Sequence, residues 1–169
     1  MLNNRFVVSL SLVACVAFLL VGSVMAGEKK ITKKELPGTV LNAFERAYPK
    51  ATIKGLARED EDGKTCYEIE SLDGKTRRDI LYFANGKVAE IEEVVGENAL
   101  PDAVKAAVTK EFPKGKISKA EKLTHDSVVE YEIHIMSGKI KHELVLDPGG
   151  KVVKKENEKE EDEKDEMKK

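Results

Sequence analysis

The sequence LPGTVLNAFERAYPKATI at residues 36–53 returns 64 residues later as LPDAVKAAVTKEFPKGKI at residues 100–117. The match continues without a gap, and 16 of the 53 positions from Leu36 to Val88 are identical to the residue 64 positions further on. A fixed period of this length indicates a structural unit that is written twice.

Each copy begins with a helical pattern. Pro37 and Pro101 suit the start of a helix, where a missing N–H costs nothing. Apolar residues then recur at helical spacing until Pro49 and Pro113 end the pattern. Further along, apolar and charged residues alternate, as in Tyr131-Glu132-Ile133, and this period of two predicts half-buried strands.

The predicted fold class is α+β: a tandem duplication of a helix plus about four antiparallel strands, with the helices packed on one face of the sheet. Asp73-Gly74 and Ser137-Gly138 are the predicted hairpin turns, because glycine tolerates positive φ. The other face of an antiparallel sheet can stay uncovered. We therefore look for function on that open face.

The N-terminal residues predict export. Arg5 precedes an uncharged apolar run, and Val24-Met25-Ala26 matches a signal-peptidase site, so cleavage is predicted after Ala26. The less favoured alternatives are a retained membrane anchor, since the apolar run is close to spanning length, and a lipoprotein attached through Cys15. The protein is predicted to be periplasmic or secreted, with no membrane attachment after cleavage. The predicted division is a signal peptide at 1–26, a basic linker at 27–35, a first repeat at 36–96, a second repeat at 97–153 and a charged disordered tail at 154–169.

Composition and motifs exclude several classes of function. A net charge of −2 offers no basic field for nucleic acid. No nucleophile–base pair, phosphate loop or metal-ligand spacing is evident, so we predict no catalytic residues, no cofactor and no enzymatic activity. Cleavage would leave Cys66 as the only thiol. It is interpreted as a small, partly covered side chain, with an intermolecular disulfide as the alternative.

Two carboxylate pairs follow from the predicted turns. Glu68 is expected opposite Asp79, and Glu132 opposite Glu143. Like charges directly opposite each other are destabilising. Three explanations are open. The pairs could form a weak site for divalent cations or for a cationic partner, their carboxyl groups could have raised pKa values, or nearby lysines and arginines could neutralise the face.

The three histidines are not predicted to bind metal. His134 and His142 are expected on opposite faces of the sheet, and His125 in a loop. A site made of histidines alone would need an unusual geometry.

The ordered motifs L-P-x-x-V-x-x-A, then Y/F-P-x-x-x-I, then Y-E-I, G-K and G-K-V occur twice, between Leu36 and about Val153. This set resembles the PepSY-like family of exported bacterial proteins, which shares its two-unit architecture with the beta-lactamase inhibitory protein. The resemblance implies an extracytoplasmic, non-enzymatic fold, with protein binding or peptidase regulation as its function. It brings no catalytic residues with it.

We therefore predict an extracytoplasmic protein-binding module that regulates a peptidase or an envelope protein through the open sheet face. The alternative is a periplasmic cation-responsive or stress-related binding protein that uses the paired carboxylates. The partner would be a protein or peptide, and the oligomeric state stays open. Leu81 and Phe83 are either apolar anchors for the partner or contacts with the sister unit. The predicted partner-binding residues are Glu68, Glu70, Arg77, Asp79, Leu81, Phe83, Glu132, Lys141 and Glu143.

Overall fold

In the part of the chain that the structure describes, nine strands form one antiparallel sheet, and each strand pairs with its neighbours along the chain in the order β1 to β9. The structure is a computed structural model and describes residues 28–61 and 64–158. The strands are β1 Glu28–Lys30, β2 Thr52–Glu61, β3 Lys64–Asp73, β4 Thr76–Phe83, β5 Val88–Val94, β6 Lys116–His125, β7 Val128–Ser137, β8 Ile140–Leu146 and β9 Val152–Glu158.

Two α-helices, α1 Gly38–Ala47 and α2 Asp102–Glu111, lie where the proline-bounded patterns predict them. Pro37 and Pro101 stand at their N-caps, and a short 3-10 helix, η1 Glu97–Ala99, precedes α2. Within the described residues, no helix is long and apolar enough to cross a membrane.

The predicted fold class is wrong. The strands do not divide into two helix-plus-four-strand units, because β5 pairs with β6 from Ile91–Thr124 to Val94–Glu121 and β1 adds a further strand at one edge. Over residues 28–61 and 64–158, the fold is one nine-stranded sheet that carries two ten-residue α-helices. A strand edge with unpaired N–H and C=O groups pairs readily with another edge, and the local sequence pattern does not show which edges will meet.

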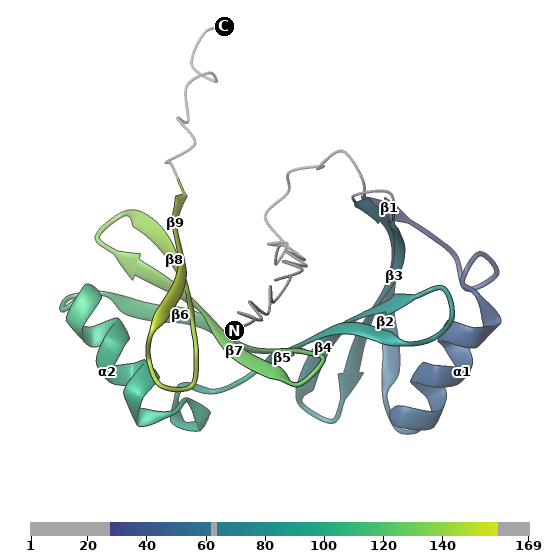
Figure 1. Ribbon diagram of the computed structural model, residues 1–169, viewed down its shortest axis with the longest axis horizontal. Coiled ribbons are helices and arrows are strands. Elements are labelled where there is room, and N and C mark those ends of the chain that lie inside the picture. Colours follow the sequence, from purple (N-terminus) through teal and green to yellow (C-terminus); the bar gives the residue numbers. More distant parts are fainter. Residues whose placement is uncertain (1–27, 62–63, 159–169) are drawn as a thin grey trace, which may run out of the picture.

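The two helices pack on the same face of the sheet. Figure 1 shows that the sheet bends along its length, with α1 and α2 on its outer side towards the two ends. The core under α1 consists of Leu36, Val40, Phe44, Ile69, Ile80 and Tyr82. The core under α2 consists of Leu100, Val104, Val108, Ala120, Ile133, Ile135, Leu144 and Leu146.

The predicted hairpin registers are wrong, because each turn lies one residue further along the chain than predicted. Gly74 and Gly138 are the first of the two central turn residues, with φ of +61° and +67°, so Asp73 pairs with Thr76 and Ser137 with Ile140. Glycine takes this first position in type II′ hairpins.

The shifted register changes both predicted carboxylate pairs. Glu68 lies opposite Leu81, and Glu132 lies opposite Val145. Asp79 lies opposite Glu70 instead, and Glu143 lies opposite His134.

Both ends of the sheet extend into segments for which the sequence predicts no strand. β1 lies in the predicted linker, and β9 contains residues 154–158 of the predicted tail. The predicted signal peptide, with Cys15 and the cleavage site after Ala26, lies outside the described residues, as does the rest of the tail at 159–169.

Candidate functional site

The face opposite the helices is the candidate site. Side chains alternate between the two faces of a strand, and Ile69, Ile80, Ile133 and Leu144 belong to the helix-covered core. Their neighbours in sequence therefore point to the helix-free face, on the inner side of the bend (Figure 1). All nine residues predicted to bind a partner lie on this face: Glu68, Glu70, Arg77, Asp79, Leu81, Phe83, Glu132, Lys141 and Glu143.

Acidic residues face one another across the middle of this face. Asp79 lies opposite Glu70 of β3 on one side and opposite Glu92 of β5 on the other. Across the next pair of strands, Glu121 of β6 lies opposite Glu132 of β7. Like charges in such positions repel, so protons or cations must offset them.

Protons offset part of this charge. Burial raises the pKa of Glu92 to about 9, and the carboxylates of Glu121 and Glu90 raise it further. Burial also raises the pKa of Glu90 to about 7. The pKa of Asp79 is raised by burial first and then by Glu70 and Glu121. Near neutral pH, Glu92 therefore keeps its proton.

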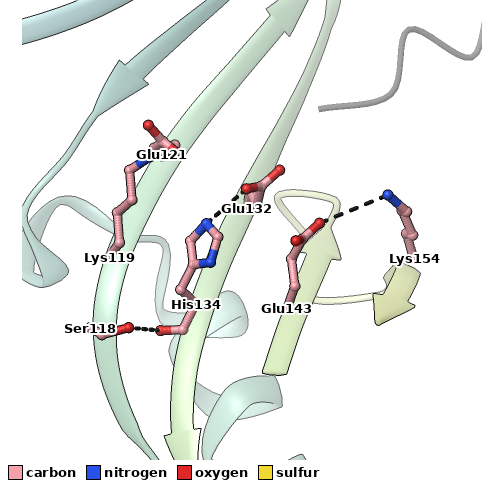
Figure 2. Close-up of polar contacts among 7 residues, drawn as sticks. All are labelled: Ser118, Lys119, Glu121, Glu132, His134, Glu143 and Lys154. Carbon is pink, nitrogen blue, oxygen red and sulfur yellow. Dashed lines mark hydrogen bonds and ion pairs between the residues drawn. The ribbon is translucent and has the colours of Figure 1, made fainter. Parts of the chain in front are cut away.

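Three residues of β6 and β7 form a deeply buried polar group on the face, shown in Figure 2. Glu121 and Glu132 are each 2% exposed, and His134 is 1% exposed. His134 Nε2 lies 2.9 Å from Glu132 Oε1, and Lys119 Nζ lies 2.8 Å from Glu121 Oε2. One potential ligand atom from each of Glu121, Glu132 and His134 lies within 4.8 Å of the others.

Several atoms of this group have no hydrogen-bond partner within the part of the chain that the structure describes. They are Glu121 Oε1, Glu132 Oε2 and His134 Nδ1. Glu143 Oε1 also lacks a hydrogen bond, although Lys154 Nζ approaches it at 3.8 Å. Burial raises the pKa of Glu143, and the charge of Glu132 adds to this shift. Buried polar atoms are nearly always satisfied in native proteins, so these atoms are available to a further hydrogen-bond partner or ligand.

The predictions for the histidines hold in part. His134 lies on the helix-free face, whereas the ring of His142 contacts Phe112 beside α2, with centroids 4.4 Å apart, so their predicted placement on opposite faces is confirmed. His125 is not in a loop: it ends β6, and its Nε2 lies 3.2 Å from Glu130 Oε2.

Cys66 lies on the same face and is 8% exposed, opposite Phe83 of β4. The side chain is small and more fully covered than the partly covered one interpreted from the sequence. Because the thiol is buried, we expect no covalent dimer on non-reducing electrophoresis of the folded protein; a dimer band that dithiothreitol removes would contradict this.

Sequence reasoning missed Glu90, Glu92 and Glu121. The alternation in Ala89-Glu90-Ile91-Glu92 could have placed the first two on the open face. Glu121 gave no such signal, because its counterpart in the repeat is Ala57.

Two family models match the sequence. The model described as "Putative beta-lactamase-inhibitor-like, PepSY-like" matches residues 67–154, which is just over half of the chain. A second, described as "Peptidase propeptide and YPEB domain", matches residues 37–94. No curated protein matches the sequence.

Solved structures share the fold. A DUF2874 family protein from Bacteroides ovatus ATCC 8483 is 20% identical, with a TM-score of 0.57 over 72% of this chain and 86% of that chain. A "putative periplasmic" protein from Bacteroides eggerthii DSM 20697 is 18% identical, with a TM-score of 0.62 over 72% of this chain and 88% of that one. A BLIP-like protein from Bacteroides fragilis NCTC 9343 is 20% identical, with a TM-score of 0.57 over 70% and 84%.

Proposed function

Because the chain belongs to the beta-lactamase-inhibitor-like, PepSY-like family, we propose that it is an extracytoplasmic, non-enzymatic protein that binds a protein or peptide partner on its helix-free sheet face. The description of its structural neighbour from Bacteroides eggerthii as periplasmic supports the location. The inhibitor-like description of the family supports a binding role.

One observation carries the proposal: the helix-free face is continuous through the β5–β6 pairing and lies inside the bend of the sheet (Figure 1). A concave surface of this kind can contact a convex partner with both halves of the chain at once. Apolar side chains lie among the acidic ones, including Leu81 and Phe83 from β4 and the buried Leu123 and Val145. Binding surfaces commonly combine apolar anchors with a polar surround.

The charge of the face indicates the chemistry of the partner. Carboxylates outnumber basic side chains across β3 to β7, where Glu70, Asp79, Glu121 and Glu132 face each other in pairs. Complementary charge speeds association and selects among partners. We therefore propose a partner with a basic surface. Binding of such a partner would serve to regulate a peptidase or an envelope protein.

Charge reversal at Glu70 tests the proposal. The protein, expressed from its full sequence and purified in its exported form, is immobilised and used to capture proteins from an envelope extract of the source organism. We expect Glu70→Lys to lower the recovery of a specific partner by about tenfold, equivalent to about 1.4 kcal/mol. The wild-type capture should weaken as salt is added, because exposed charge pairs are screened.

Glu97→Lys is the matched control, since it makes the same charge change at an exposed residue of η1. It should leave capture unchanged. Equal losses of capture in both variants would show that only net charge matters. Full capture by Glu70→Lys would show that the partner does not bind on the open face.

A further inference from the structure

We propose that Glu121, Glu132 and His134 form a binding site for a divalent first-row transition metal, with Zn²⁺ as the representative ion. The proposal does not depend on partner binding. It rests on how three almost fully buried side chains from β6 and β7 converge.

The geometry is close to that of a metal site. One ligand atom from each residue lies within 4.8 Å of the other two. Zinc binds carboxylate oxygen and imidazole nitrogen at about 2.0–2.2 Å, so small rotations of these side chains would bring three donors onto one ion. The fourth position of a tetrahedral ion would be left for water.

The unpartnered atoms are suited to a bound cation. Glu121 Oε1 and Glu132 Oε2 are buried without a hydrogen-bond partner among the described residues, and both carboxylates come from facing positions on paired strands. A buried carboxylate oxygen without a partner is costly. A divalent ion between the two side chains would satisfy both oxygens and cancel their repulsion.

Glu143 is placed to orient the histidine. Nε2 is the nitrogen of His134 that faces Glu132, so it is the nitrogen assigned to the metal. Nδ1 then carries the proton, and it has no partner within the described chain. Glu143 lies directly opposite His134 on β8; its Oε1 forms no hydrogen bond within the described chain, and its nearest cation is Lys154 Nζ at 3.8 Å (Figure 2). A carboxylate that accepts the second N–H of a ligating histidine is the usual support of a metal site.

Lys119 competes with the metal. Its Nζ lies 2.8 Å from Glu121 Oε2, whereas 36% of its side chain is exposed. Without metal, this ammonium group and the contact between His134 and Glu132 hold the acidic group together. When metal binds, the long lysine side chain can turn towards solvent.

The donor set selects the class of metal. Imidazole suits zinc, cobalt, nickel and iron, whereas calcium takes oxygen ligands only. A neighbouring group of Asp79, Glu92 and Glu121 offers oxygen atoms alone. That neighbouring group lacks the imidazole nitrogen that favours a transition metal over calcium.

Cobalt provides the most direct test, because four- or five-coordinate Co²⁺ absorbs visible light far more strongly than the hydrated ion. The exported protein, stripped of metal, is titrated with Co²⁺ and then with Zn²⁺. We expect one Co²⁺ per chain, displaced by Zn²⁺ but not by Ca²⁺. Glu121→Gln and His134→Gln should weaken binding by about 100-fold or more, and Glu143→Gln by about 10- to 100-fold.

Two further variants separate a built site from adventitious binding. His142→Gln removes a histidine on the opposite face and should leave the cobalt spectrum unchanged. Lys119→Gln removes the competing cation and should tighten binding, which a purely structural role for Lys119 would not produce. The proposal fails if the wild type gives only the spectrum of hydrated Co²⁺, or if His142→Gln weakens binding as much as His134→Gln. Circular dichroism of the metal-free variants checks that each is folded.

Discussion

Replacing Gly150 with alanine is expected to lower the free energy of unfolding by about 3 kcal/mol or more. Gly150 has a φ of +81°, which L side chains rarely adopt. An added Cβ would also collide with the carbonyl oxygen of Ala103 at the start of α2 and lie 2.8 Å from its carbonyl carbon. Relief would require the β8–β9 turn to move away from the helix.

Gly138→Ala is the matched control. This residue also has positive φ, at +67°, but nothing lies within 4 Å of its added Cβ. Only the backbone cost remains, about 1 kcal/mol. Urea denaturation of both variants measures the difference; equal losses would show that the turn at Gly150 does not pack tightly on α2.

The second large effect is a loss of stability as the pH rises from about 5 to 8. Glu92 and Glu90 have ordinary carboxyl pKa values when unfolded, but burial raises them to about 9 and about 7 in the folded protein. In this range the folded state therefore holds more protons than the unfolded state. Stability is then greatest below the unfolded pKa and falls as the pH rises towards the folded pKa. We expect a loss of about 2 kcal/mol or more, since one pKa unit corresponds to about 1.4 kcal/mol.

The charges around Glu92 explain why it dominates this loss. Asp79 faces it from β4, while Glu121 of β6 and Glu90 of its own strand add negative charge nearby. Glu92→Gln keeps the shape of the side chain without a proton to lose. It should be more stable than the wild type at pH 8, by about 2 kcal/mol, and should flatten the pH profile between 5 and 8.

Glu97→Gln provides the control, because Glu97 is exposed in η1. Its pH profile, measured by urea unfolding at several pH values, should match the wild type. If the free energy of unfolding of the wild type instead rises from pH 5 to pH 8, the raised pKa values of Glu90 and Glu92 are contradicted.

Much of the local structure could be predicted from single residues and spacings. Pro37 and Pro101 mark the starts of the two helices, because the first turn of a helix does not need the backbone N–H that proline lacks. The alternation Tyr131-Glu132-Ile133 correctly separates core residues from open-face residues, since strand side chains alternate regardless of which strand lies next to them.

The candidate site could be predicted only in part. Glu132 and Glu143 were found, but their assumed pairing depended on the position of glycine in a two-residue turn. With Gly138 first in that turn, His134 and not Glu132 lies opposite Glu143. The imidazole of His134 meets the acidic group through its own strand, where it lies two residues from Glu132.

The sequence by itself determined where the helices begin and end and which side chains leave each strand on the same face. These are local properties, fixed by spacing along the chain. Only the tertiary structure decided that β5 and β6 join the strands into one sheet, and that Glu121 meets Glu132 and His134 out of water. Such contacts depend on hydrogen bonding between strand edges and on the register of turns, where a shift of one residue changes every partner.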